Sequence, residues 1–272
     1  MISDGFVAFT GGINIAGECF KETSKYGVWK DSSIEIRGEA VKSFTKMFLM
    51  IWNSNLEENK KFNKFKDLSY KKYLPKKKYL NAGYVISYGQ NHFNKEGVAS
   101  KVYLNIIQQS TKYLYIFTPY LILDKSFEIS LVTAAKRGVD VRIITPGIPN
   151  KKIVYKMTRS NYKVLLESGV RIYEYSKGFL HAKYFLCDDV VATVGTVNLD
   201  YRSLYTNFES GCYFYKGQII TNIKNDFIKT IQDSKEVLLS DISFSIIQDI
   251  KDVLLKLIAP FFKILLYKII ML

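Results

Sequence analysis

A repeat in register constrains the fold of this chain more than any other feature of its sequence. The stretch "DGFVAFTGGINI", which begins at Asp4, aligns without a gap with "DDVVATVGTVNL", which begins at Asp188. Aspartate, valine, alanine, glycine and asparagine recur at the same places in both copies. Two apolar strands can share the valine and alanine by chance, but the other three matches favour a duplicated unit. We therefore predict a chain built from two related halves.

Strand and helix patterns alternate through the region that contains the second copy. Short aromatic and β-branched runs are typical of buried strands, and apolar residues at helical spacing are typical of helices packed on a sheet. This alternation predicts the α/β class, with a parallel or mixed sheet covered by helices. The expected strands are 113–118, 139–145, 170–175, 180–187 and 190–194, and the expected helices are 124–137 and 151–168.

The composition limits the class of partner. The chain has 272 residues, 48% of them hydrophobic, which is enough to fill one large domain or two modest ones. Its net charge of +14 favours anionic partners: nucleic acid, anionic lipid headgroups or a phosphate-bearing substrate. Cys19, Cys187 and Cys212 are odd in number and form no C-x-x-C pair, so neither a disulfide framework nor a zinc site is indicated. A reducing, cytosol-facing location fits best.

The two ends differ from the middle of the chain. The amino terminus shows no signal-peptide pattern. The segment 253–272 is as long as a bilayer span, but its spread lysines and central proline favour a helix lying in a membrane interface; a terminal helix docked on the core stays open. The divisions expected are a first half at 1–54, a basic connecting segment at 55–90, a second half at 91–240 and the carboxyl-terminal helix at 241–272.

Polar groups suited to phosphate chemistry gather around the second copy of the repeat. In a strand, His181 and Lys183 would point to the same side. The bend at Gly195 and Thr196 would present the Asn198 amide at the end of the next strand. A cation and an amide can bind phosphate oxygens, while a histidine attacks phosphorus or protonates the leaving oxygen. The grouping therefore predicts a phosphoryl-transfer site that needs no metal.

A carboxylate that holds the imidazole is also expected. Glu209 lies just before the run "CYFYK", from where it could accept the distal ring N–H of His181 and fix the tautomer, although a surface role for this glutamate stays open. The chain's other histidine, His92, sits in the polar stretch "SYGQNHFNKEG" and is predicted to be a surface residue.

These residues carry a resemblance to a known family. His181-x-Lys183-x4-Asp188, followed by Gly195-Thr196-x-Asn198, resembles the HxKxxxxD signature of the phospholipase D superfamily. The stretches "KGFLHAK" and "ATVGTVNLDYRS" look like those of bacterial cardiolipin synthases, and similarity extends over nearly the whole chain. The resemblance implies a two-half α-β-α sandwich with mixed sheets and one active site at the pseudo-twofold junction, with the first half incomplete.

The resemblance also implies a role for each matching residue. His181 would be one of two catalytic histidines, with Asp188 completing its signature. His181, Lys183 and Asp188 are the implied catalytic residues, and Lys183 is also implied to bind phosphate. The implied substrate-binding residues are Thr196, Asn198 and Asn14; the implied supporting residues are Glu209 and Asp4; Gly12 and Asp31 are further matches in the first half.

The implied reaction is phosphatidyl transfer. One phosphatidylglycerol gives a phosphatidyl-histidine and releases glycerol, and a second phosphatidylglycerol attacks the intermediate to form cardiolipin. No metal or organic cofactor is implied. The implied partners are phosphatidylglycerol and the anionic surface of the cell membrane on its cytoplasmic face, and nucleic acid is disfavoured.

The first copy of the repeat lies close to the start of the sequence, and this bears on the expected activity. The counterparts of His181 and Lys183 in the first copy would precede Met1. Because one histidine cannot easily serve as both nucleophile and acid, the chain is expected to be a fragment, or to have a mis-called start, with weak or no activity alone. Two alternatives stay open: a homodimeric single-motif phosphodiesterase or nuclease that pairs two His181 residues, and a non-catalytic lipid-binding remnant.

Overall fold

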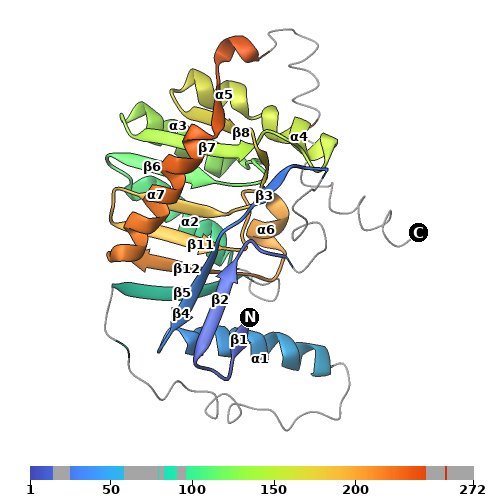
Figure 1. The fold of residues 1–272 in the computed structure, drawn as a ribbon, viewed down its shortest axis with the longest axis vertical. Helices are drawn as coiled ribbons and strands as arrows, with labels where there is room; N and C mark the ends of the chain where they lie inside the picture. The colour runs from blue at the N-terminus through green and yellow to red at the C-terminus, as the bar shows by residue number, and fades with distance from the viewer. Residues whose placement is uncertain (15–24, 58–78, 80–82, 91–95, 243–254, 256–272) are drawn as a thin grey trace, which may run out of the picture.

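The computed structural model describes residues 1–14, 25–57, 79, 83–90, 96–242 and 255 (Figure 1). Cys19, His92, most of the lysine-rich connecting segment and nearly all of the apolar carboxyl-terminal segment lie outside these residues. No helix of the described part of the chain is long and apolar enough to cross a membrane.

A mixed eight-stranded sheet forms the centre of the fold, as the α/β pattern predicted (Figure 1). Its order is β13-β8-β7-β6-β10-β11-β12-β5; β6, β7 and β8 are parallel and the other pairs are antiparallel. The strands are β5 (Tyr84–Gln90), β6 (Tyr113–Phe117), β7 (Asp140–Pro146), β8 (Arg171–Tyr175), β10 (Tyr184–Cys187), β11 (Val191–Gly195), β12 (Glu209–Tyr215) and β13 (Ser234–Val237).

Apolar side chains cover both faces of this sheet, which explains why its central strands read as continuous apolar runs. Helices α2 (Val98–Gln109), α3 (Lys125–Lys136) and α5 (Tyr162–Glu167) build the core on one face. The other face is covered by α7 (Gln218–Gln232), which crosses the sheet in Figure 1, together with elements of the first half. Short helices α4 (Lys152–Arg159) and α6 (Tyr201–Tyr205) complete the second half, followed by the 3-10 turn Leu239–Asp241.

The first half contributes a small sheet in the order β1-β2-β4 and the helix α1, seen at the lower side of the molecule in Figure 1. Their bounds are β1 (Ile2–Ser3), β2 (Val7–Gly11), β4 (Ser33–Arg37) and α1 (Val41–Glu57). Ala8, Ile34 and Ile36 join the core on the α7 side of the large sheet. A third sheet pairs β3 (Val28–Lys30) with β9 (Gly178–Leu180), so the two halves also meet through backbone hydrogen bonds.

Three expectations from the sequence differ from the structure. The run 180–187 is not one strand, because β9 leaves the large sheet to pair with β3 and the chain re-enters as β10 after Lys183. The helix expected at 151–168 is two helices, α4 and α5, separated by Ser160 and Asn161. Residues 84–90, placed in the connecting segment, form β5 at one edge of the large sheet.

The sequence repeat is also a structural repeat. Strand β1 pairs with β2 in the same register as β10 with β11: Ile2 faces Ala8, and Leu186 faces Ala192. The next pair matches too, since Gly11 faces Ser33 in β2–β4 and Gly195 faces Gly211 in β11–β12. One backbone hydrogen bond recurs at the same place, from Gly12 N to Ser32 O and from Thr196 N to Ser210 O, both 2.9 Å.

The repeat makes Asp31 and Glu209 equivalent. Each lies two residues before the strand position that pairs with the matching glycine, Ser33 in one copy and Gly211 in the other. This equivalence comes from the strand register and was not visible in the ungapped sequence alignment, because the loops between the paired strands differ in length. It places one carboxylate at the same point of each half.

The aspartates at the start of each repeat form its turn. Asp4 and Asp188 both have positive φ angles, 49° and 54°. Asp188, in addition, accepts hydrogen bonds at 2.7–2.9 Å from the backbone N–H groups of Thr111, Lys112 and Tyr113 and from the Thr111 hydroxyl. The Asp188 carboxylate therefore fixes the entry to β6, which is a structural task rather than the catalytic one implied by the resemblance.

We expect Asp188→Ala to lower the free energy of unfolding by about 1–3 kcal/mol more than Asp4→Ala, measured in urea at pH 7. Both variants place alanine at a positive φ, so the strain of that backbone conformation is common to both and drops out of the difference between them. Burial opposes ionisation of Asp188, but the hydrogen bonds outweigh it and lower its pKa from 3.8. The Asp188 contribution is therefore present above about pH 4 and is lost as the pH falls through the lowered pKa. Equal losses in the two variants would contradict this role.

Candidate active site

His181 is placed by the parallel pair β3–β9. In this pair Val28 faces Gly178 and Lys30 faces Leu180, and the His181 N–H donates to Lys30 O at 2.7 Å. A side chain at position 178 would lie 2.1 Å from the Val28 carbonyl oxygen, so glycine there permits the close approach. Because the register is fixed, the residues that follow the two strands, Asp31 and His181, lie side by side.

The carboxylate beside the imidazole is Asp31, which corrects the assignment of that role to Glu209. Asp31 Oδ2 lies 2.8 Å from His181 Nδ1. An ionised carboxylate offers only acceptors, so Nδ1–H donates to Asp31 and Nε2 keeps its lone pair in the neutral ring. The half that contains the His-x-Lys sequence therefore receives its orienting carboxylate from the other half.

The imidazole lies in an enclosed, aromatic environment. His181 is 8% exposed, and its ring centroid lies 5.2 Å from that of Trp29 and 5.9 Å from that of Phe179. Burial lowers the His181 pKa below 6.5, Asp31 opposes this shift, and the charge of Lys183 adds to it. The ring is therefore neutral at pH 7, the state in which Nε2 can act as a nucleophile or base.

Lys183 lies beside the histidine, although the two residues do not share a strand. Its ammonium group donates to the carbonyl oxygen of His181, and the side chain is almost fully buried. A cation held here is placed to attract a phosphate group that approaches the ring. The expectation that both residues lie in one strand is wrong, because residues 181–183 connect β9 to β10.

Gly12 makes room for this arrangement. A Cβ at position 12 would lie 2.1 Å from Asp31 Oδ1 and 2.7 Å from the carbonyl oxygen of His181. The equivalent position in the second copy is Thr196, whose hydroxyl donates to Glu209 and accepts from the Ser210 N–H at 3.0 Å. The two equivalent carboxylates thus have different partners: Asp31 holds an imidazole, and Glu209 holds a threonine hydroxyl.

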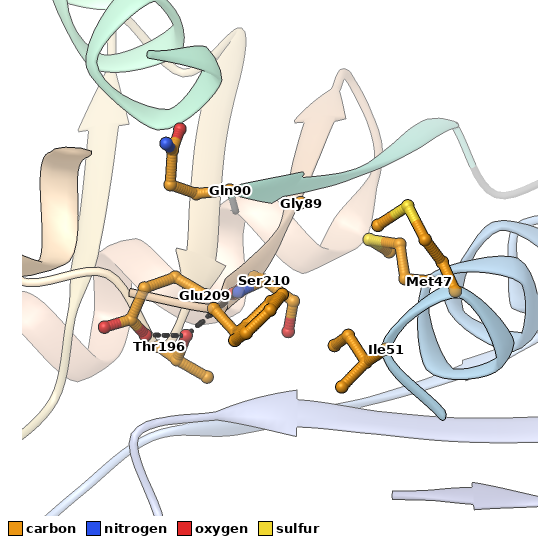
Figure 2. Close-up of a pocket in the computed structure, with 9 residues that line it drawn as sticks. Met47, Ile51, Gly89, Gln90, Thr196, Glu209 and Ser210 are labelled. Atoms are coloured by element: carbon orange, nitrogen blue, oxygen red, sulfur yellow. Dashed lines mark hydrogen bonds between the residues drawn. The ribbon is translucent and has the colours of Figure 1, made fainter. Parts of the chain in front are cut away.

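Glu209 lies at a cavity of about 280 Å³ (Figure 2). Its other oxygen accepts from Asn207 Nδ2 at 3.1 Å, and burial raises the Glu209 pKa above 4.5. Thr196 lines the same cavity. The remaining lining residues come from α1, β5, β12 and the residue before β12, and they are Met47, Met50, Ile51, Gly89, Gln90, Phe208 and Ser210.

The other residues named from the sequence lie in varied settings. Asn198 Nδ2 donates to Asp200 and to the Ser203 hydroxyl, each at 3.1 Å, so both of its N–H groups are used within the chain. This arrangement orders the loop before α6 instead of offering the amide to a phosphate. Asn14 and Asp4 are exposed. Among the described residues, no group of three histidine, cysteine, aspartate or glutamate side chains could hold a metal ion.

Comparisons with known proteins show what the chain is similar to. Residues 103–231 match the family described as "Cardiolipin synthase, PLD-like domain". A cardiolipin synthase of Clostridium perfringens is 34% identical over 269 residues, covering 96% of this chain and 54% of the relative. The chain belongs to the phospholipase D superfamily.

Two further comparisons define the extent of this likeness. An uncharacterized protein of Streptococcus mutans is 42% identical over 263 residues, covering 96% of this chain and 55% of the relative. The crystal structure of a phosphatidylserine synthase of Haemophilus influenzae aligns with a TM-score of 0.66 at 17% identity, over 99% of this chain and 69% of that one, and so shares its fold. The chain spans about half the length of the curated relatives it matches.

Proposed function

We propose that this chain carries the second-half catalytic machinery of a cardiolipin synthase-type phosphatidyl transfer, with phosphatidylglycerol as donor and acceptor at the cytoplasmic face of the cell membrane. The observation that carries the proposal is the buried Asp31–His181 pair with the Lys183 ammonium beside it. The cardiolipin synthase relatives support the choice of substrate. The functional division of the chain expected from its sequence, including the carboxyl-terminal interface helix, belongs to this proposal.

The proposed chemistry depends on the neutral state of the His181 ring. Nε2 of neutral His181 forms a bond to the phosphorus of phosphatidylglycerol, the bond from phosphorus to the glycerol oxygen breaks, and a general acid protonates that oxygen. The hydroxyl of a second phosphatidylglycerol then gives its proton to the base left by that acid and attacks phosphorus, and the bond from phosphorus to Nε2 breaks, giving cardiolipin and the free imidazole. Asp31 stabilises the positive ring of the intermediate, and Lys183 offsets charge that develops on the phosphate oxygens.

The general acid in the first step has to be a group other than the attacking ring, because that ring is bonded to phosphorus. The reverse assignment, in which His181 is the acid and a second group attacks, uses the same Asp31 contact. In both assignments the reaction requires His181 and one further proton-carrying group, so the rate of the chain alone depends on what supplies that group.

The proposal is tested by incubating the chain with labelled phosphatidylglycerol in anionic vesicles and measuring cardiolipin and released glycerol. His181→Ala is the test variant, and His92→Ala is the matched control. Product that requires His181 but not His92 supports the proposal. If the chain alone gives no product, the assay is repeated with the part of the S. mutans relative that this chain does not match. Failure of that mixture as well, with folded proteins, would refute the proposal.

The alternative of a homodimeric nuclease is less consistent with the geometry. It requires two copies to bring their His181 rings together, but His181 is buried and already held by Asp31 of the same chain. The net charge of +14 is the feature that favours it. Cleavage of DNA that depends on His181, in place of phosphatidyl transfer, would establish this alternative.

A further inference from the structure

Trp29 carries a buried hydrogen-bond donor for which the described part of the chain offers no acceptor. Its side chain is half-buried, but Nε1 is covered and makes no hydrogen bond within the described residues. An indole N–H only donates, and most buried polar groups in folded proteins are paired. The other buried polar atoms in this condition are hydroxyl groups, which also accept, and amide oxygens; they belong to Ser32, Tyr88, Tyr184, Thr193, Asn161 and Asn198. A fixed donor such as Trp29 Nε1 therefore indicates an acceptor from outside the chain.

The pairing of β3 with β9 places this donor beside the reactive ring. Trp29 faces Phe179 in the register, and Asp31 and His181 each follow two residues later. Because residues two apart in a strand project to the same side, these four side chains gather on one face of the pair. The ring centroid of Trp29 accordingly lies 4.8 Å from that of Phe179 and 5.2 Å from that of His181.

The neighbours of the indole do not compete for its N–H. Phe179 and Tyr26 present aromatic rings, with centroids 4.8 Å and 6.4 Å from that of Trp29. Asp31 is the carboxylate on this face, but Oδ2 faces His181 Nδ1 and Oδ1 accepts from the Ser32 N–H, each at 2.8 Å. An acceptor brought by a ligand would therefore meet the indole N–H without displacing a hydrogen bond of the chain.

The charge beside the ring selects the kind of acceptor. The Lys183 ammonium is almost fully buried and donates to the carbonyl oxygen of His181. A buried cation attracts an anionic oxygen and repels a ligand ammonium, so the aromatic rings around Trp29 are unsuited to a cationic headgroup. A phosphodiester spreads a negative charge over two non-bridging oxygens. It can thus offer one oxygen to the ammonium and the other to the indole N–H.

We propose that the Trp29 indole N–H binds a non-bridging oxygen of the phosphodiester that reacts at His181. The inference rests on the function proposed above, and Trp29 is not among the residues implied by the resemblance. Trp29 Nε1, His181 and Lys183 are all buried at this place, so the opening that admits phosphorus to the ring also uncovers the indole nitrogen. Since no hydrogen bond of the chain is broken in exchange, the new bond contributes its full strength to substrate binding.

Two other partners for this donor give different results. The N–H can point at the face of the Phe179 or His181 ring, which is a weak contact that a ligand leaves unchanged. A bound water can accept the hydrogen bond in the free chain, and removal of the N–H would then cost stability. The two measurements below separate these cases from a bond to phosphate.

The indole proton itself is the first readout. The chain has two tryptophans, so Trp52→Phe leaves a single indole N–H signal in the NMR spectrum of the isotope-labelled chain. The probe is glycerophosphoglycerol, which keeps the phosphodiester of phosphatidylglycerol without its acyl chains. We expect a saturable downfield shift of the Trp29 signal with this probe and none with glycerol. In the matched Trp29→Phe chain, the signal of Trp52, which is 54% exposed, should stay in place. A Trp29 signal that does not move up to the solubility limit of the probe would overturn the inference.

The second measurement removes the N–H and keeps the ring system. Benzothienylalanine in place of Trp29 carries sulfur where the indole has N–H. We expect the dissociation constant of the probe to rise about 10- to 100-fold, because a hydrogen bond to an anionic oxygen is lost. The unfolding midpoint of the free chain should stay equal or rise, because a buried unpaired donor is removed. An unchanged dissociation constant would overturn the inference, and so would a lower midpoint, which assigns the N–H to a contact within the free chain.

These readouts measure binding and do not depend on turnover. A Trp29 shift in a chain that shows no phosphatidyl transfer under either assay condition would leave this inference standing and refute the proposed reaction. Transfer that requires His181, with a Trp29 signal that does not respond to the probe, would refute this inference alone.

Discussion

Replacing His181 by alanine is expected to abolish phosphatidyl transfer, with a fall in rate of at least about 10³-fold. His181 is the only histidine among the described residues, so within them no other imidazole lies against Asp31. The measurement is the initial rate of glycerol release from labelled phosphatidylglycerol, under whichever condition gives product with the unchanged chain.

A covalent readout separates the two roles that a histidine can have. If His181 is the nucleophile, labelled phosphatidyl groups become attached to the chain after acid quenching, and the label is absent in His181→Ala. If His181 is instead the general acid, the label in His181→Ala forms on another group. It persists there because its breakdown is slowed in that variant. His92→Ala is the control in both cases. Transfer at the normal rate by a folded His181→Ala chain would show that the buried Asp31–His181 pair is not the reaction centre.

The loss in His181→Ala has to be separated from a loss of structure. The ring packs between Trp29 and Phe179, so its removal leaves a space in the pairing of β3 with β9. His181→Gln keeps more of the volume and a hydrogen-bonding group, but it cannot form a phosphorus–imidazole bond. Equal inactivity of the alanine and glutamine variants, with unfolding midpoints near that of the unchanged chain, identifies a chemical rather than a structural cause.

The sequence predicted the fold class well because the signals were local. The buried strand at 113–117 and the helix at 125–136, which the Asp124 side chain caps at its amino end, follow from patterns within a few residues. The break between β9 and β10 did not follow from pattern, because both pieces are apolar and buried. Pairing with the distant strand β3 decides it, and a periodicity of two cannot report a partner about 150 residues away.

The site was predicted only in part, because patterns in the sequence report neighbours along the chain and not distant partners. His181 and Lys183 are close in sequence, so their proximity needed no knowledge of the fold. The partner of His181 was assigned to the nearest carboxylate downstream, Glu209, whereas the structure brings Asp31 from the other half. A signal did exist: Asp31-Ser32 and Glu209-Ser210 each come just before the strand residue that pairs with the matching glycine of the repeat. It becomes readable only when the register of β2–β4 is compared with that of β11–β12.

The hydrogen bond between Asp31 of the first half and His181 of the second half has a functional consequence. Asp31 belongs to the first half and His181 to the second, so the reactive ring is oriented only when both halves are folded together.

Asp31→Asn tests the positioning role of the carboxylate, and we expect transfer to slow by roughly 10²- to 10⁴-fold with the fold preserved. An amide is uncharged, so it cannot stabilise the positive ring, and it no longer selects the tautomer with the proton on Nδ1. Asp226→Asn is the matched control, because Asp226 is paired with Lys30, the neighbour of Asp31, at 2.7 Å and does not hold the ring. The control should stay within about threefold of the unchanged chain.

The pH dependence gives the readout that a merely structural role would not change. Burial lowers the His181 pKa, so the acid limb of the rate profile should lie below the ordinary value of 6.5 in the unchanged chain if neutral His181 is the attacking group. Asp31 raises this pKa against the effect of burial, so its replacement by asparagine should move the limb to still lower pH. A profile that stays in place in Asp31→Asn, but shifts in Glu209→Gln, would instead assign the imidazole to Glu209, because the group whose charge sets the His181 pKa must be the one that faces the ring.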